Sequence, residues 1–511
     1  MKKHVYYYFN GFFLLLKLNY SMNAITALLK TDFGNPDGLY DSNLENYFFD
    51  NEYWRKIVRE HAYFVIGRKG TGKSAIYNWI KNREAENGMI ISNLSFKSFP
   101  FQKLLNLSND DFSRPNQYQS IWKYIILSEF AKQIVLDAQN NTHSHYSELN
   151  DFVKYKFGKN LKDLHTKITT STNKTEFGLQ FKGFGPKQAS EESMQLGDEI
   201  ENISEINSRL EDLILDNLAE TQRSYLIQFD QLDDNYTLYI DNKKYFESLI
   251  SLFKVIYSLN SLILGCNKNS KVIAYLRSDI YNQFSSNDPD SAKFDYHTYK
   301  LNWTIINKND WNNPPLLQLI NIRIENSVSE LTGKGSFNYI FNKRFIKLRE
   351  NRKPIDPFRY IIHRTFHRPR DLVQFCIKIK EQADIMNRLD VSTIMAAEKE
   401  YSSWLIDELK NEIAPIIPST DTLFALLRTV GTETFNSNYF KRKYFETGNK
   451  NINKSPEALL RYLYDLGIVS NIQFGKNGAS LYSIIRNEKS KFDPKMKAVI
   501  HSGILKGLYT Y

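Results

Sequence analysis

Cysteine is almost absent from this chain, and its body holds no long apolar run. The two cysteines, Cys266 and Cys376, each lie within a mainly apolar stretch. Two such residues cannot build a disulfide framework or a zinc site made of cysteines, so we expect buried, inert thiols and a reducing, cytoplasmic setting. Beyond the first residues, no stretch approaches the roughly 18 uncharged apolar residues of a membrane span. The sequence therefore predicts no stable membrane insertion.

The first residues imitate a signal peptide, because Lys2 and Lys3 precede an apolar run over Val5–Leu16. That run is too short to span a bilayer, and no small-x-small cleavage pattern follows it. Two interpretations stay open. Either residues 1–21 are a mis-assigned start and Met22 begins the working protein, or the segment touches a membrane surface.

Length and composition indicate a folded protein of several domains. The 511 residues exceed what one hydrophobic core usually organises, which predicts two to four domains. The hydrophobic share of 42% and the charged share of 24% are ordinary for a globular chain. A net charge of +10 suits nucleic acid or another acidic partner, but a general drift in composition also scatters lysines along a chain. Charge alone leaves the partner open.

Four short apolar runs predict the strands of a parallel sheet. They are Tyr63–Ile66, Met89–Ser92, Tyr225–Phe229 and Lys271–Leu276, and helix-compatible sequence separates them. Strands that alternate with helices form parallel sheets covered on both faces. We therefore expect an α/β core over residues 44–310.

This core must hold an insertion, because the stretch between the second and third predicted strands is far longer than one crossover helix needs. We place the insertion at about residues 97–220. Helices are predicted at Ser120–Ala138 and Glu199–Ala219. Between them we expect an exposed excursion over about Lys154–Gln195 that contains a small hairpin at Phe177–Phe184.

Three further regions flank the core. Residues 1–43 form an N-terminal segment. Residues 311–415 have a mostly helical pattern, with prolines that mark helix starts, and we expect a helical lid. Residues 416–511 combine helices with two strands joined by an Asn-Gly turn, which is typical of a winged helix. The predicted elements there are Thr422–Arg428, Pro456–Leu466, Ile468–Phe474 and Ala479–Ile485.

A glycine-rich motif follows the first predicted strand. Its residues match G-x-x-x-x-G-K-[ST] between a strand and a helix, the context that a phosphate-binding P-loop requires. Backbone N–H groups there face one centre, at the positive end of the helix. Lys73 is expected to reach the β and γ phosphates of ATP, and the Ser74 hydroxyl to ligate Mg²⁺. The expected nucleotide-binding set is Gly67, Arg68, Lys69, Gly70, Thr71, Gly72, Lys73, Ser74 and Ala75.

The third predicted strand ends in a cluster of acids. Asp230 follows Phe229 directly, where a neighbouring parallel strand delivers a carboxylate beside Ser74, and we expect it to hold Mg²⁺. Asp233 and Asp234 are expected to polarise the attacking water. The alternative is a solvated acidic turn. With the glycine motif, this pattern predicts an α/β P-loop NTPase core with a parallel sheet of the additional-strand type.

Three arginines are candidates for reading the γ phosphate. Arg277 ends the fourth predicted strand, a place where side chains meet a site. Arg368 and Arg370 flank Pro369 at a helix entrance in the lid, and we expect one of them, most simply Arg370, to reach phosphate while the other faces solvent. The alternatives are a structural salt bridge for Arg277 and ordinary surface charges for the lid pair.

One short motif points to a different nucleotide. Asn307-Lys308-Asn309-Asp310 matches the element by which many GTPases read guanine. Four such residues arise easily in a chain rich in Asn and Lys. GTPases of that kind also carry Asp-x-x-Gly after the second acidic strand, and Asp230 is followed by Gln231-Leu232-Asp233 instead. We therefore expect ATP to be preferred over GTP.

With these motifs the sequence resembles the STAND-type ATPases, which include the NACHT proteins and are related to initiator ATPases. More narrowly, the run from Gly67 to Ala75, the turn Asp230-x-Leu232-Asp233-Asp234 and Arg368-Pro369-Arg370-Asp371 are similar to a poorly characterised bacterial P-loop family. The resemblance implies a Walker B role for Asp230, an acidic doublet and a strand-end sensor at Arg277. Arg370 only approximates a second sensor.

Two functions remain open at this point. The favoured one is a slow ATP hydrolase that acts as a nucleotide-dependent switch, with an effector protein as partner and oligomerisation on ATP binding. The resemblance implies bacterial signalling or antiviral defence, by analogy of class. Since the tandem repeats of many STAND proteins are missing, the trigger is expected to be a separate protein. The alternative is a DNA-binding ATPase that grips duplex through its winged helix. Neither an ABC-transporter signature nor an evident kinase acceptor site occurs.

Overall fold

The computed structural model describes most of the chain. Residues 1–21 lie outside the described part, as do the predicted hairpin Phe177–Phe184 and the whole motif Asn307–Asp310. The described ranges are 22–84, 88–96, 118–157, 203–235, 242–285, 291–305, 311–341, 346, 354–432, 434–447, 452–475, 478–487 and 489–509.

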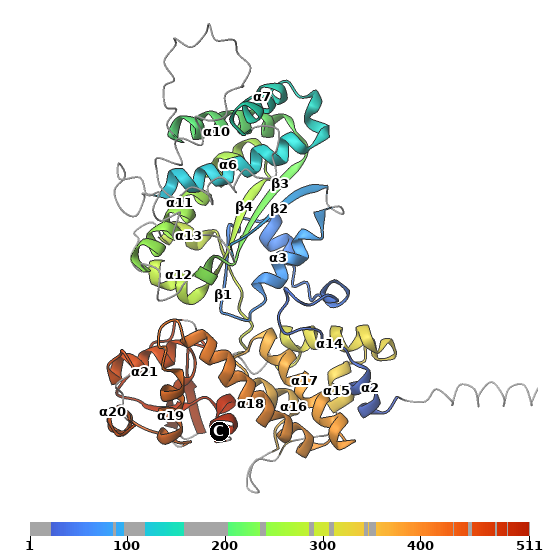
Figure 1. Cartoon of the computed structure of the whole chain (residues 1–511). Helices are drawn as coiled ribbons and strands as arrows, with labels where there is room; N and C mark the ends of the chain where they lie inside the picture. Colours follow the sequence, from blue (N-terminus) through green and yellow to red (C-terminus); the bar gives the residue numbers. More distant parts are fainter. Residues whose placement is uncertain are drawn as a thin grey trace, which may run out of the picture.

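A five-stranded parallel sheet forms the centre of the upper part of the molecule in Figure 1. Its order is β2-β3-β4-β1-β5, so β4 separates β1 from β3, as the additional-strand type requires. All four predicted strands are confirmed. The fifth, β5, was not predicted, because it is only three residues long and partly exposed. The strands are β1 Phe64–Gly67, β2 Met89–Ser95, β3 Ser224–Asp230, β4 Lys271–Arg277 and β5 Thr298–Lys300.

The register of the sheet brings the carboxyl ends of its strands to one edge. Gly67 at the end of β1 pairs with Arg277 at the end of β4. Asp230 ends β3, opposite Ser95 of β2. Because parallel strands end on the same side, the glycine motif, the acidic turn and Arg277 are neighbours, although β3 and β1 are not adjacent.

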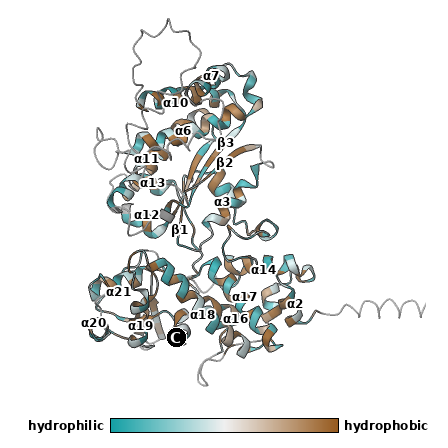
Figure 2. Cartoon of the chain, in the orientation of Figure 1, coloured by the Kyte–Doolittle hydropathy of each residue, from teal (hydrophilic) through white to brown (hydrophobic). Residues whose placement is uncertain are grey.

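Each face of the sheet packs on its own core. On β1, Val65 points to one core, whereas Phe64 and Ile66 point to the other. Helix α3 (Lys73–Lys81) covers the first face, and the second face is covered by helices from the insertion and from the segment after β3. Figure 2 shows hydrophobic colours along the strands and mixed colours on the covering helices. The second set is α6 Gln119–Leu136, α10 Ile203–Glu220 and α11 Asn242–Cys266.

The insertion agrees with the prediction at its two helices but not between them. Both predicted helices are confirmed as α6 and α10. The excursion expected from about Lys154 does not begin there, because helix α7 (Tyr146–Phe157) continues past that residue. Its middle, residues 158–202, lies outside the described part.

Helix α11 corrects two expectations. Lys243–Cys266 is long and apolar enough to cross a membrane, by length and composition only, although the sequence showed no such stretch. Just over half of its most apolar window, 56%, is buried against the protein, as in a core helix. At its end Cys266 is exposed, so the expectation of two buried thiols holds only for Cys376.

A helical region follows the sheet. Three of its helices begin with proline at the first turn, as predicted, because proline there loses no helical hydrogen bond. The N-terminal helix α2 (Ala24–Lys30) packs against α15 and α17 of this region. The helices are α14 Pro315–Ser327, α15 Ser336–Phe341, α16 Pro357–Ile362, α17 Pro369–Met386 and α18 Val391–Ile413.

The last residues form helices and a small antiparallel sheet of order β7-β6-β8. The predicted second strand ends early, because a turn begins at Ser483. Strand β8 was not predicted, and neither was α22, which packs against α18. The elements are α19 Thr420–Val430, α20 Ser437–Glu446, α21 Pro456–Asp465, β6 Val469–Gly475, β7 Gly478–Tyr482, β8 Lys497–Ile500 and α22 Ser502–Leu508.

Candidate nucleotide site

The glycine motif forms a tight loop between β1 and α3. Gly70 and Gly72 have φ values of 81° and 96°, a conformation that side chains with a Cβ rarely adopt. A Cβ on Gly70 would also lie 3.2 Å from the Cβ of Arg370 at the start of α17. Position 70 therefore needs glycine for two reasons. The loop has a positive φ there, and the helical region approaches it closely.

Lys73, the first residue of α3, lies inside this loop. Its ammonium donates hydrogen bonds to the carbonyls of Gly67 and Arg68, at 2.9 and 3.3 Å. Burial lowers the pKa of Lys73, and the carboxylates of Asp233 and Asp230 act in the opposite direction. The loop thus holds one cation at its centre, between backbone carbonyls and two acids.

Asp230 ends β3 as a buried carboxylate with free acceptor capacity. Its Oδ2 atom is buried and has no hydrogen-bond partner. Burial raises the pKa of Asp230 to about 6, although a hydrogen bond with Ser74 works against this shift. A hard cation is the natural partner for such an oxygen, so the residues fit Mg²⁺. Within the described residues no group of three or more His, Cys, Asp or Glu side chains is placed to hold a metal, so phosphate and water oxygens would complete the set.

Arg277, at the end of β4, lies among three carboxylates. Its guanidinium contacts Asp279 at 2.7 Å, Glu412 of α18 at 3.3 Å and Asp233 at 3.8 Å. Burial alone disfavours the charged form, but Asp279 and Glu412 outweigh it and raise the pKa of Arg277. Arg277 and Asp233 both line the cavity described below. The side chain of Asp234 lies outside the described part.

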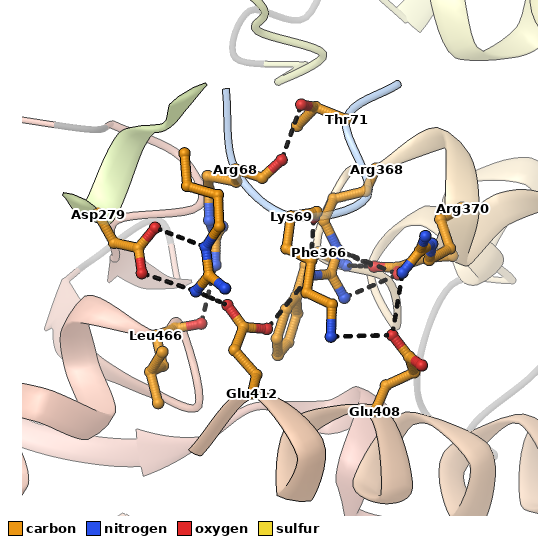
Figure 3. A network of polar contacts seen from close by, with 12 residues as sticks. Arg68, Lys69, Thr71, Asp279, Phe366, Arg368, Arg370, Glu408, Glu412 and Leu466 are labelled. Atoms are coloured by element: carbon orange, nitrogen blue, oxygen red, sulfur yellow. Dashed lines mark hydrogen bonds and ion pairs between the residues drawn. The ribbon is translucent and has the colours of Figure 1, made fainter. Parts of the chain in front are cut away.

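Arg368 and Arg370 point in different directions, and neither faces open solvent. Arg370 lines the cavity and pairs with Asp37 at 3.0 Å and Glu408 at 3.2 Å. Arg368 is buried, pairs with Asp371 at 2.8 Å and donates to the carbonyl of Lys69 at 3.1 Å. The expected division between nucleotide and solvent is therefore wrong for Arg368, which lies beneath the glycine loop (Figure 3).

Arg68 also leaves the cavity. Its guanidinium donates to the carbonyl of Leu466 at 2.8 Å and lies over the ring of Phe366. Burial, together with Arg368, lowers the pKa of Arg68. Of the predicted binding set, residues 69–75 line the cavity, whereas Gly67 and Arg68 do not. The side chain of Arg68 instead links the glycine loop to the turn before β6.

The cavity itself has a volume of about 510 Å³, and much of its wall was not predicted. Residues 35–49, here called the N-terminal strap, cross the start of α3 so closely that a Cβ on Gly38 would lie 2.6 Å from that of Ala75. The strap contributes Asp37, Tyr47 and Phe48. A local signal was present, because Asn-Pro-Asp-Gly is a turn sequence. The remaining wall includes Trp303, Leu319, Arg323, Val373, Glu408 and Pro415.

The chain has relatives, but they leave its family open. A model of the FunZ-associated C-terminal helical domain matches residues 314–410, from α14 through most of α18. The transposon gamma-delta 80.3 kDa protein of Escherichia coli K12 is 23% identical over 494 residues, which is 90% of this chain and 64% of that protein. The chain thus spans slightly less than two thirds of this relative's length.

One solved structure can be aligned with most of this chain. It is the Aeropyrum pernix ORC1 protein in complex with DNA, which is 11% identical. The match covers 88% of this chain and 86% of that one, with a TM-score of 0.32. At this score the likeness carries no argument about function, so the site must be interpreted from its own residues.

Proposed function

We propose that this protein binds ATP with Mg²⁺ and hydrolyses it slowly, as a nucleotide-dependent switch. The observation that supports this most is the buried Asp230 oxygen without a partner, beside Ser74 and in the same cavity as the glycine loop. A buried acceptor left unpaired is costly unless a ligand satisfies it. A bound Mg²⁺ ion would satisfy it.

The residues of the loop and the strand ends then have separate roles. Lys73 reaches the β and γ phosphates and leaves its present carbonyl partners. When bound, Mg²⁺ neutralises charge on the phosphates and is held by Ser74 and Asp230. Asp233, with Asp234, orients the attacking water, and Arg277, which lines the same cavity, contacts the γ phosphate. The aromatic side chains that the strap contributes to the cavity suit the purine base. Adenine is preferred over guanine.

The switch follows from the contacts between the loop and the helical region. The backbone N–H of Arg370 donates to the carbonyl of Gly70 at 3.3 Å, so α17 begins directly on the glycine loop. Arg370 reaches the γ phosphate only while this contact exists. ATP therefore stabilises the docked lid by a contact that ADP lacks. In this proposal residues 311–415 are the lid, and residues 416–511 are a winged helix that moves with it.

The experiment that tests nucleotide binding is Lys73→Ala in a calorimetric titration with Mg·ATP. Loss of a charge-assisted contact costs about 2 kcal/mol, which is about a 30-fold weaker affinity. The melting temperature should change less than the affinity, because the ammonium donates its hydrogen bonds to backbone carbonyls of its own loop. An unchanged affinity would refute the site, and a preference for GTP in competition would refute the choice of base.

A second function, DNA binding, is favoured by one surface feature. The hairpin of β6 and β7 carries Phe474 and Tyr482 with exposed fractions of 62% and 44%, and exposed aromatic side chains can stack on the bases of nucleic acid. On α20, however, Arg442 and Lys443 pair with Glu446. Salt-sensitive stimulation of the ATPase by duplex DNA, lost in Phe474→Ala and kept in the exposed control Tyr155→Ala, would establish this function.

A further inference from the structure

Helix α18 brings two carboxylates to the edge of the nucleotide cavity. Glu408 and Glu412 lie one turn apart and therefore on the same face of the helix. Glu408 contacts Arg370 at 3.2 Å and Lys69 at 3.6 Å. Glu412 contacts Arg277 at 3.3 Å and Arg368 at 3.9 Å. Figure 3 shows both acids rising from α18 toward the loop and the arginines.

These contacts connect α18 with three separate parts of the site. Lys69 belongs to the glycine loop, Arg277 to the end of β4, and Arg370 to the start of α17. Arg277 and Arg370 are also the side chains proposed to meet the γ phosphate. The anions that now neutralise these cations are therefore protein carboxylates, and the two glutamates on α18 are among them.

The two glutamates differ in their access to the ligand. Glu408 lines the cavity, together with Lys69 and Arg370. Glu412 is not part of the cavity wall and pairs with the buried Arg368. A phosphate that entered would thus meet Glu408 directly, whereas Glu412 positions arginines behind the wall.

We infer that Glu408 is a competitor of the γ phosphate, which couples the nucleotide state to helix α18; the inference rests on the proposed ATP binding. Arg370 already has two acidic partners, Asp37 and Glu408. A γ phosphate adds a third anion to the same cation, and like charges at this range repel. With ATP, the contact between Glu408 and Arg370 weakens. With ADP, it stays.

Helix α18 is placed to carry this change to the end of the chain. On α18, the Ser402 hydroxyl accepts a hydrogen bond from the N–H of Gly507 in α22 at 2.7 Å, and Glu398 pairs with Lys506 at 2.6 Å. A Cβ on Gly507 would lie 2.8 Å from the Ser402 carbonyl, so the two helices touch at backbone distance. Near its other end, Lys410 pairs with Asp421 of α19.

The test is Glu408→Gln in the full chain, compared with Asp407→Asn. Both variants change the net charge equally, but Asp407 is exposed on the same helix and does not line the cavity. Calorimetric affinities are measured for Mg·ADP and for a non-hydrolysable Mg·ATP analogue. We expect Glu408→Gln to raise the preference for the triphosphate over ADP by about fivefold or more, the ordinary range of coupling between sites. Asp407→Asn should leave the preference as in the wild type.

Two further variants separate charge from packing. Glu408→Asp keeps the charge and should keep a preference near that of the wild type. Glu408→Ala removes the same charge and replaces Glu408→Gln if that variant does not fold. A preference that is unchanged or lower after loss of the charge overturns the inference, while the proposed ATP binding stands. If the wild-type protein binds neither nucleotide, the inference about Glu408 and the proposed ATP binding are both wrong.

Discussion

At the scale of single residues, the two lid arginines show how position in a helix decides a role. Arg368 is the extended residue before α17, and Arg370 lies in its first turn, so their side chains leave in different directions. One reaches Asp371 beneath the glycine loop and the other reaches the cavity. Sequence placed both at a helix entrance but could not tell which side of the loop each would occupy.

We predict opposite phenotypes for the two arginines. Arg368→Ala leaves the buried Asp371 carboxylate without its cation and should lower the free energy of unfolding by about 3 to 5 kcal/mol in a urea titration. Arg370→Ala should change stability far less, because its partners Asp37 and Glu408 are partly exposed.

Arg370→Ala should instead reduce the preference for ATP over ADP while ADP affinity is kept. It should also remove an ATP-dependent change in protease sensitivity. If Arg370→Ala keeps the wild-type preference and the wild-type change on ATP, this residue is not a sensor. A stable Arg368→Ala variant would contradict the buried ion pair.

At the scale of elements, local patterns predicted most of the core. The strands β1 to β4 are apolar runs with clear ends, and the glycine loop follows β1 within a few residues. Because parallel strands end together, Asp230 and Arg277 could be placed beside the loop without knowing any side-chain contact. The strands β5 and β8 escaped prediction because they are short and take their pairing from distant segments.

The rest of the site depends on contacts between remote segments. Asp37 lies in a turn sequence and Glu408 in no motif, and neither pattern predicts a partner, yet both pair with Arg370. Arg68 lies within the motif but points to Leu466, near the other end of the chain. These partners are fixed only by the way the strap, the helical region and residues 416–511 pack together. A pattern of residue types does not predict that packing.

The strap supplies a test at this scale, because Gly38 touches α3. In Gly38→Ala the new Cβ would lie 2.6 Å from the Cβ of Ala75 and 3.0 Å from its Cα. One of the two backbones must move, which costs about 1 to 3 kcal/mol. We expect lower stability and weaker nucleotide affinity, measured by urea titration and calorimetry.

Gly265→Ala is the matched control, since no atom lies within 4 Å of a Cβ there. It should keep wild-type affinity and stability, with a slight gain from helix propensity. Should Gly38→Ala bind nucleotide as tightly as this control, the strap is not part of the binding site.

At the scale of the whole molecule, histidine and arginine side chains from distant segments gather under the glycine loop. His363 and His367 precede α17, and His501 precedes α22. Arg68 and Arg486 act on both His367 and His501. The region therefore joins the glycine loop, the helical region and the last helix around side chains that must stay neutral.

The physical cause of this neutrality is burial, strengthened by the neighbouring positive groups. Burial lowers the pKa of His367 to about 3 and that of His501 to about 3, and it lowers the pKa of His363 to about 4. An unfolded histidine titrates near pH 6.5. Between these values the unfolded chain binds more protons than the folded one, so stability is complete above about pH 6.5 and falls as the pH decreases toward 3.

We predict that this acid sensitivity is removed by replacing the two most buried histidines. In His367→Asn/His501→Asn, Asn suits both positions, because His367 has a left-handed φ of 53° and the His501 side chain caps α22 by accepting from Gly503. In urea titrations the wild type should lose on the order of 2 kcal/mol per histidine between pH 7 and pH 5, and the variant should lose clearly less.

His61→Asn, at an exposed position, should behave as the wild type. Equal losses in wild type and variant would show that His367 and His501 do not govern acid stability. A smaller loss in the variant would show that burial of His367 and His501 in their neutral form causes the acid sensitivity.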